Sequence, residues 1–160
     1  MNKALFLDRD GVLNFERGDY TYKPEDFEIL PHVVEVLKLA RDRGYLLIVI
    51  SNQSGIDKGY YTIKDVEILH KMMQDELAKS KLHFAEIYYS IYHPSVTQSL
   101  SRKPGSIMLE KAIARFKLNK DLCLMVGDKE RDIEAANGAG VRGILIESNS
   151  DLRQIEKYLN

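Results

Sequence analysis

The chain of 160 residues has a single cysteine, a net charge of only -1 and no long hydrophobic run. Because Cys123 has no second thiol to pair with, an intramolecular disulfide is excluded, and its apolar neighbours predict a packed core thiol. The small net charge argues against a protein that binds nucleic acid or an anionic membrane. No apolar run approaches the roughly 20 residues that a membrane-spanning helix needs.

The sequence also lacks repeats, low-complexity tracts, linkers and the basic-then-apolar layout of a secretory signal at its N-terminus. Apolar residues make up 44% and charged residues 29% of the chain, which is typical of a soluble globular protein. A chain of this length buries a sizeable core in one domain. We therefore expect a single domain over residues 1–160, in a cytoplasmic protein that works as a monomer.

Hydrophobic segments alternate with helical patterns along the whole chain. Such alternation is typical of a parallel sheet with helices on both faces. We predict an α/β fold of three layers, a Rossmann-like parallel sheet without a large cap domain, because core elements fill the gaps between the polar clusters. Strands are predicted at 4–7, 45–50, 85–91, 122–126 and 143–146, and helices at 31–43, 62–79, 105–117, 129–139 and 150–159.

Two of these helices carry recognisable end signals. Pro31 suits a first helical position and Gly44 a helix end. Thr62 with Asp65 three positions later resembles a capping box at the start of the 62–79 helix. Helical spacing in this second helix predicts a buried stripe of Ile63, Val66, Leu69, Met73 and Leu77.

Two aspartates, Asp8 and Asp10, follow the first hydrophobic strand, and Gly11 follows them. Like charges at this spacing repel each other, so the arrangement is useful only if a cation or a reaction employs them. The alternative is a simple turn, since Asp and Gly both favour turns. The buried strand before the two aspartates favours a metal-binding or catalytic role over a simple turn.

Three further polar clusters lie after a strand or before a helix: Ser51–Gly55, Arg102–Gly105 and Gly127–Lys129. Each has a structural alternative, namely a polar loop, a helix start and a helix cap respectively. In parallel α/β sheets, however, ligands bind outside the carboxyl ends of the strands, near a topological switch point. We therefore expect the clusters to converge on one edge of the sheet.

The converging residues suit the transfer of a phosphoryl group. A carboxylate attacks phosphorus when a hard cation such as Mg²⁺ neutralises the phosphoryl charge. Asp8 is the predicted nucleophile and metal residue, and Asp10 the predicted acid/base and metal residue. Asp128 completes the predicted metal site, while Ser51 and Lys103 would stabilise the transferring group.

The chain resembles the haloacid dehalogenase-type phosphatase superfamily. Its four motifs match Asp8–Gly11, Ser51, Lys103 and Gly127–Asp132, so the resemblance spans essentially the whole chain. The segments 8–14, 51–56, 102–105 and 126–129 are closest to one subgroup. This subgroup holds the D-glycero-D-manno-heptose 1,7-bisphosphate phosphatases and the histidinol-phosphate phosphatases.

The resemblance implies further roles for individual residues. Asp132 is left open between a second-layer position behind the metal and the helix surface. The segment Glu16–Tyr20 falls where the family keeps a substrate loop. The implied substrate-binding residues are Glu16, Arg17, Gly18, Tyr20, Asn52, Gln53, Ser54, Arg102 and Lys129.

One departure from the subgroup concerns its structural zinc loop. The positions that match the cysteine and histidine ligands are Ser90, Tyr92, Ser99 and Ser101, which are poor zinc ligands. His93 alone makes no site, and the other histidines, His32, His70 and His83, are interpreted as surface or helix residues. We therefore expect Mg²⁺ as the cofactor and no structural zinc.

The expected activity is a Mg²⁺-dependent phosphomonoesterase that converts heptose 1,7-bisphosphate to heptose 1-phosphate, a step of carbohydrate metabolism toward lipopolysaccharide. The expected partner is a small phosphorylated sugar, with no nucleic acid or membrane involved. Histidinol phosphate is the alternative substrate. A phosphate-binding scaffold without activity is the alternative from another class, and the intact motif residues argue against it.

Overall fold

The computed structural model describes residues 2–160 and contains a five-stranded parallel sheet. After β1 the chain builds one half of the sheet out to β3, and it then returns to form β4 on the other side of β1. This reversal between β1 and β4 is a topological switch point. The strands are β1 (Lys3–Leu7), β2 (Tyr45–Asn52), β3 (Glu86–Ser90), β4 (Leu124–Gly127) and β5 (Arg142–Leu145), in the spatial order β3-β2-β1-β4-β5.

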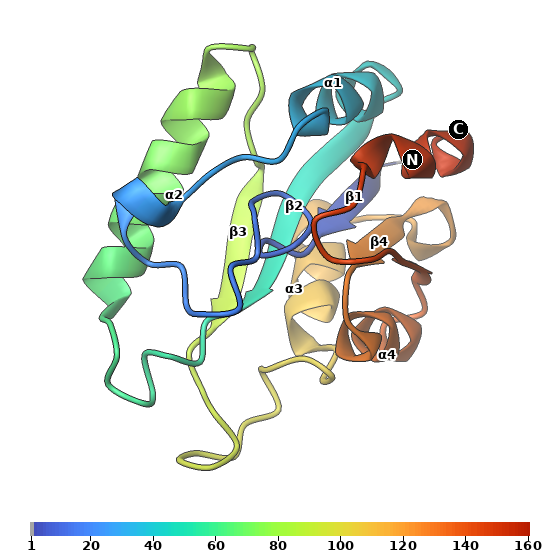
Figure 1. Cartoon of the computed structure of the whole chain (residues 1–160). Helices are drawn as coiled ribbons and strands as arrows, with labels where there is room; N and C mark the ends of the chain where they lie inside the picture. The colour runs from blue at the N-terminus through green and yellow to red at the C-terminus, as the bar shows by residue number, and fades with distance from the viewer. Residues whose placement is uncertain (1) are drawn as a thin grey trace.

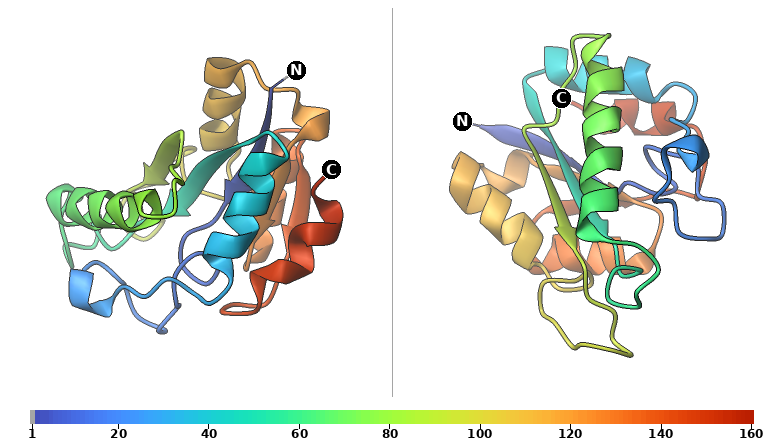
Figure 2. Two further views of the ribbon diagram at one scale, coloured as in Figure 1. Left: turned by 90° about the horizontal axis from the view of Figure 1, so that it is seen from above. Right: turned by 90° about the vertical axis from the view of Figure 1, so that its left-hand side faces the viewer.

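Helices cover both faces of this sheet (Figures 1 and 2). The predicted three-layer, Rossmann-like α/β fold is therefore confirmed. Within residues 2–160, no helix has both the length and the apolar character required to cross a membrane. The α-helices are α1 (Val33–Asp42), α2 (Ile63–Ala78), α3 (Ile107–Phe116) and α4 (Glu130–Gly138), and the 3-10 helices are η1 (Pro24–Asp26), η2 (Lys120–Leu122) and η3 (Leu152–Tyr158).

The first strand, β1, contributes side chains to both hydrophobic cores. Leu5 and Leu7 pack with residues of α1, α2 and η3, while Ala4 and Phe6 pack with residues of α3 and α4. Successive side chains of a strand point to opposite faces, so a short strand in the middle of the sheet serves both layers. Cys123 is buried in the second core, which agrees with its prediction as a core thiol.

Some element boundaries differ from the prediction. The helix expected from Pro31 begins only at Val33, because His32 adopts a left-handed conformation with φ of 66° at the N-cap. The fourth strand begins at Leu124 rather than 122, since η2 occupies Lys120–Leu122. The last predicted helix is a 3-10 helix, η3, rather than an α-helix.

The start of α2 matches the prediction, but its buried stripe begins later than expected. The Thr62 hydroxyl accepts from the Asp65 N–H at 3.2 Å, and the Asp65 carboxylate accepts from the Thr62 N–H at 2.8 Å, which completes the capping box. Ile63 is 45% exposed, so its assignment to the core was wrong. The stripe runs from the second turn of the helix and consists of Val66, Leu69, Met73 and Leu77.

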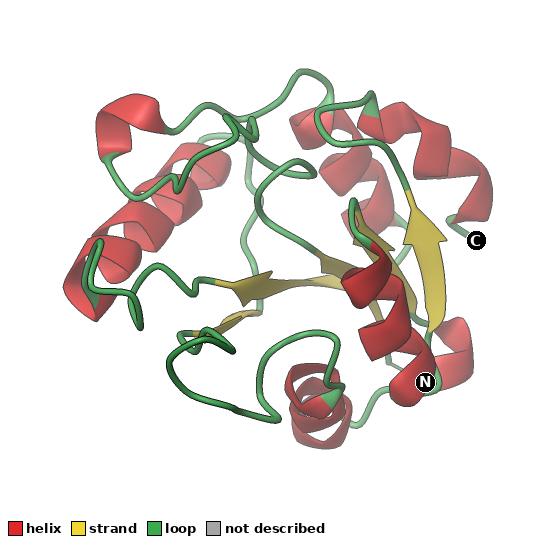
Figure 3. Ribbon diagram, turned by 60° about the horizontal axis from the view of Figure 1, so that its bottom comes forward, coloured by secondary structure: helices red, strands yellow, loops and turns green. Residues whose placement is uncertain are grey.

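Loops follow the carboxyl ends of the strands and gather at one edge of the sheet, which Figure 3 brings forward. Residues 8–32 contain one short helix, η1, and residues 91–106 form a loop without helix or strand. No folded cap is inserted in the described part of the chain, as predicted. Loops therefore form the walls around the carboxyl ends of β1, β2 and β4.

Candidate active site

Asp8 extends the pairing of β1 with β4 by one residue beyond the strand. Its backbone N–H donates to the carbonyl of Val126 at 2.9 Å, so residue 8 lies beside the end of β4. Asp128 follows that end directly. The switch point thus places two predicted site carboxylates next to each other.

Lys103 reaches this pair from the loop before α3, although it is 95 residues from Asp8 in sequence. Its ammonium nitrogen lies 2.8 Å from Asp8 Oδ1 and 2.6 Å from Asp132 Oδ1, and it donates to the Ile50 carbonyl at 2.7 Å. The side chain is only 1% exposed. Burial lowers the pKa of Lys103, but Asp8 and Asp132 outweigh it and raise that pKa overall, so the lysine is charged.

The side chain of Asn52 fixes the backbone of Lys103. Its amide nitrogen donates to the Lys103 carbonyl at 3.0 Å, and its amide oxygen accepts from the Lys103 N–H at 3.0 Å. This paired contact joins the end of β2 to the loop before α3. Asn52 therefore holds the lysine in place, and its amide is occupied by that contact.

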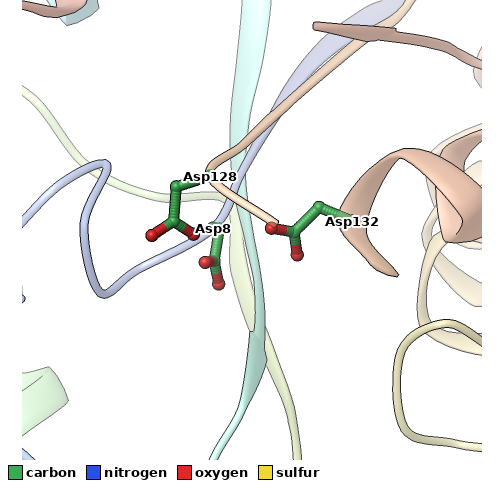
Figure 4. A group of neighbouring side chains, drawn as sticks. All are labelled: Asp8, Asp128 and Asp132. Atoms are coloured by element: carbon green, nitrogen blue, oxygen red, sulfur yellow. The ribbon is translucent and has the colours of Figure 1, made fainter. Parts of the chain in front are cut away.

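Asp132 joins Asp8 and Asp128 in an acidic cluster, in which one carboxylate oxygen from each residue lies within 4.8 Å of the others (Figure 4). Asp132 is fully buried, so the helix-surface interpretation is wrong. Its Oδ2 accepts from the Lys129 N–H at 3.1 Å and thereby caps α4. Gly127 lies so close that a Cβ there would be 2.2 Å from the Cβ of Asp132.

The cluster brings three carboxylates together with one ammonium group. Burial raises the pKa of Asp8 well above its ordinary value, Lys103 lowers it, and Asp132 and Asp128 raise it further. Asp128 Oδ1 is buried without a hydrogen-bond partner in the described chain, and its Oδ2 accepts from Ser148. Hard oxygen donors, excess negative charge and a free buried oxygen suit Mg²⁺.

Asp10 lies apart from this cluster and has its own set of donors. Its Oδ1 accepts from Arg9 at 2.9 Å and from Asn14 at 3.0 Å, and its Oδ2 accepts from Gln53 at 3.2 Å. Burial raises the pKa of Asp10, but Arg9 and these hydrogen bonds outweigh it and hold the pKa below its ordinary value. Asp10 is therefore ionised, and its predicted metal contact stays a prediction.

Arg9 stands behind Asp10 and is completely buried. Its guanidinium also donates to the Thr21 carbonyl at 2.7 Å and lies 3.3 Å from His70 Nε2. His70 is on α2, as a helix residue was expected to be, but it is only 6% exposed. His32 and His83 are exposed.

A cavity of about 540 Å³ opens above Asp8. Two predicted site residues do not line it. Arg17 instead forms an ion pair with Asp26 at 2.9 Å, and Ser51 is fully buried beneath the cavity. The predicted residues along its wall are Asp8, Asp10, Glu16, Gly18, Tyr20, Asn52, Gln53, Ser54, Arg102, Lys103, Asp128 and Lys129.

The segment after β2 uses its side chains mainly inside the protein. The Gln53 amide donates to the Ser51 hydroxyl at 2.8 Å and to Asp10, and its oxygen accepts from Tyr61 at 2.9 Å. Gln53 is only 2% exposed. All three residues predicted to bind phosphate here line the cavity, but the amides of Asn52 and Gln53 are engaged by other protein groups.

Three residues along the cavity were missed, namely Thr21, His93 and Arg131, and Asp19 lies in the predicted substrate loop but was not named as a binding residue. Burial lowers the pKa of Arg102, and the charge of Arg131 lowers it further, because the two cations are neighbours. Arg131 follows Asp128 by three residues at the start of α4. This spacing at a helix start that faces the site could have indicated its location.

The serines at the expected zinc positions lie together. The Ser101 hydroxyl is 2.9 Å from that of Ser90 and 2.9 Å from that of Ser99. The carbonyl of Tyr92 accepts from Arg102 at 3.0 Å. Hydrogen bonds therefore connect the end of β3 with the loop that leads to Lys103.

Comparisons with known proteins agree with this architecture. The family model described as HAD-hydrolase-like matches the sequence over residues 100–158. A Helicobacter pylori protein named D-glycero-beta-D-manno-heptose-1,7-bisphosphate 7-phosphatase is 38% identical over 99% of this chain and 90% of its own length. A Photorhabdus laumondii protein with the corresponding alpha name is 37% identical over 87% of this chain and 79% of its own length.

Solved structures give the same picture. The D,D-heptose 1,7-bisphosphate phosphatase from B. bronchiseptica, complexed with magnesium and phosphate, superposes with a TM-score of 0.86 at 25% identity. The match covers 96% of this chain and 84% of that one. A HAD-like phosphatase from Mesorhizobium loti has a TM-score of 0.84 at 30% identity, over 90% of this chain and 72% of that one.

Proposed function

Because the chain belongs to the haloacid dehalogenase-like hydrolases, in the family of the heptose-bisphosphate phosphatases, we propose that it is a Mg²⁺-dependent phosphatase of heptose 1,7-bisphosphate. The reaction would release the 7-phosphate and leave heptose 1-phosphate. One observation carries the proposal. Asp8 faces a cavity of about 540 Å³ at the switch point of the sheet, with the Lys103 ammonium 2.8 Å away and two further carboxylates beside it.

Asp8 and Asp128 would hold the cation, with Asp10 as a further proposed contact. When bound, Mg²⁺ supplies positive charge against the phosphoryl oxygens and the clustered carboxylates. Asp132 stands behind Lys103 and sets its position, since its Oδ1 lies 2.6 Å from the lysine nitrogen. This arrangement gives Asp132 a supporting role rather than direct contact with the substrate.

The chemistry of the chain's own residues follows from their positions. Asp8 attacks the phosphorus atom and forms an aspartyl phosphate, and the bond from phosphorus to the sugar oxygen breaks. Lys103 supplies fixed positive charge beside Asp8 as the new bond forms. Ser51 would donate its hydroxyl hydrogen to the transferring group, since the hydroxyl oxygen already accepts from Gln53.

Asp10 would give a proton to the leaving sugar oxygen and later take one from the water that hydrolyses the intermediate. Its three donors favour the ionised form, which suits the second step. The dianionic phosphate of the substrate raises the pKa of a neighbouring carboxylate. Substrate binding thus favours the protonated Asp10 that the first step requires.

The rim of the cavity suits a second anionic group on the substrate. Lys129, Arg102 and Arg131 all line it. Within residues 2–160, neither guanidinium forms an ion pair with a carboxylate, although Arg102 donates to the Tyr92 carbonyl. Two cations that repel each other gain from an anion between them. This favours a bisphosphate over a monophosphate.

The proposal is tested by phosphate release from a panel of sugar phosphates with Mg²⁺, with Asp8→Asn as the matched blank. We expect heptose 1,7-bisphosphate to give the highest kcat/KM and the variant to be inactive, because an amide cannot form the acyl phosphate. A higher kcat/KM on histidinol phosphate would identify histidinol phosphate as the substrate instead of the heptose bisphosphate. A folded protein that is inactive on every compound would overturn the proposal.

We further propose that the enzyme acts as a single-domain monomer in the cytoplasm. One chain brings together the proposed nucleophile, the lysine and the neighbouring carboxylates, so the proposed reaction needs no residue from a second copy. Light scattering on the purified protein tests the monomer, and a stable dimer would refute it. Cell fractionation tests the location.

A further inference from the structure

We propose that Tyr61 is a positioning residue of the phosphatase reaction: its hydroxyl fixes the Gln53 amide, which in turn holds Asp10 and Ser51. The inference deepens the proposed function and rests on it. Tyr61 does not line the cavity and is 5% exposed, so it has no direct route to the substrate. Its effect has to pass through Gln53.

The hydrogen bonds of Gln53 define one orientation of its amide. The amide oxygen accepts from the Tyr61 hydroxyl at 2.9 Å, while the amide nitrogen donates to Ser51 Oγ at 2.8 Å and to Asp10 Oδ2 at 3.2 Å. An amide offers two hydrogens on one end and an acceptor on the other. If it turned over, its oxygen would face the ionised Asp10, and two acceptors would oppose each other.

Gly55 lets the Tyr61 ring come close enough for its hydroxyl to reach Gln53. The Tyr61 hydroxyl is the donor in this contact, because the amide oxygen of Gln53 can only accept. A Cβ at position 55 would lie 2.2 Å from the Tyr61 ring, so only glycine lets the ring approach. The close approach at Gly55 therefore helps to place the tyrosine.

Two tyrosines of the segment after β1 pack near the ring of Tyr61. Tyr22 stacks on it, with centroids 4.8 Å apart and planes at 11°, and Tyr20 lies 5.7 Å away at 59°. Tyr20 in turn lines the cavity. A rigid aromatic stack thus connects the wall of the cavity to the residue that orients Gln53.

The loss of the Tyr61 hydroxyl should affect turnover more than binding. Without it the Gln53 amide can rotate away from Asp10 and Ser51, while Arg9 and Asn14 still hold the other oxygen of Asp10. We therefore expect Tyr61→Phe to lower kcat by about tenfold and to leave KM within about twofold. Tyr22→Phe removes a hydroxyl from the same stack and should change neither constant.

A double-mutant cycle separates this role from a merely structural one. If Tyr61 acts through Gln53, Tyr61→Phe combined with Gln53→Ala should be no slower than Gln53→Ala alone. Rate losses that multiply would overturn the proposal, and so would an unchanged kcat in Tyr61→Phe. Thermal unfolding of each variant shows whether it is folded at the assay temperature.

A spectroscopic measurement keeps the inference testable apart from the activity. The side-chain amide protons of Gln53, observed by NMR, should shift in Tyr61→Phe and stay unchanged in Tyr22→Phe. An unchanged Gln53 signal in Tyr61→Phe would refute the proposed contact. If the wild-type protein hydrolyses no substrate of the panel, the proposed function fails, while this measurement still decides whether Tyr61 orients Gln53.

Discussion

His70 should make the protein less stable in mild acid. It lies on α2, is 6% exposed, and presents Nε2 to the Arg9 guanidinium at 3.3 Å. Burial lowers the pKa of His70 to about 3, and the charge of Arg9 adds to this effect, whereas Asp10 opposes it. A protonated imidazole has no acceptor to offer Arg9, so the contact exists only with neutral His70.

The two pKa values of His70 give the direction and the size of the change in folding stability. In the unfolded chain His70 has its ordinary pKa of 6.5, and in the folded protein about 3. Between these values only the unfolded state binds the proton, so folding stability falls as the pH falls. At pH 5.0, about 1.5 units below the unfolded value, the loss is about 2 kcal/mol, at roughly 1.36 kcal/mol per unit.

Urea unfolding at pH 7.5 and pH 5.0 measures this loss. Carboxyl groups also contribute to the loss of stability in acid, so the wild type is compared with His70→Gln. This variant keeps an acceptor for Arg9 but has no imidazole to protonate. The stability lost between the two pH values should be smaller by about 2 kcal/mol in this variant. The exposed His83→Gln serves as the control and should follow the wild type. The reasoning is refuted if His70→Gln loses as much stability in acid as the wild type does.

Three further predictions concern the acidic cluster and the metal. Gly127→Ala should lower the free energy of unfolding by about 1–3 kcal/mol in urea titrations, because the new Cβ would lie 2.2 Å from the Cβ of Asp132; an unchanged midpoint would contradict the close packing. Asp132→Asn removes one of the two carboxylates on Lys103 and should reduce kcat by about tenfold in steady-state assays; full activity would mean that the lysine needs only Asp8. Chelation should abolish turnover, Mg²⁺ should restore it, and elemental analysis should find no stoichiometric zinc; one bound zinc per chain would refute the assignment of the serine loop.

The residues that line the cavity could largely be located from the sequence, because position at a strand end decides where they lie. Asp8 and Asp128 follow β1 and β4, and parallel strands bring their carboxyl ends to one edge. Lys103 was identified by its place before a helix and by the resemblance. For these residues the local pattern and the topology are sufficient.

The supporting residues could not be located in this way, since their roles depend on contacts across the fold. Asn52 and Gln53 follow Ser51 and resemble a phosphate-binding loop, yet their amides hold Lys103 and Asp10. His70 shows no local feature that distinguishes it from a surface residue. Such roles depend on which partner faces a side chain after folding.

The two aspartates after β1 differ in their partners, which explains how like charges persist two residues apart. Asp8 pairs with Lys103, and Asp10 pairs with Arg9. Burial raises the pKa of Asp8 well above its ordinary value, while Arg9 and the surrounding donors hold that of Asp10 below it. These pKa directions favour a protonated Asp8 and an ionised Asp10. The proposed roles need the opposite, since a nucleophile must be ionised and a general acid must be protonated.

The ligands of the proposed reaction would reverse both directions. A divalent cation held by Asp8 and Asp128 would stabilise the ionised nucleophile, because an opposite charge lowers the pKa of a carboxyl group. A phosphate dianion near Asp10 favours its protonated form for the same electrostatic reason. The pair would therefore become competent only when cation and phosphate are both present. The pH dependence of kcat should then differ from that of metal binding by the free chain, and identical profiles would contradict this coupling.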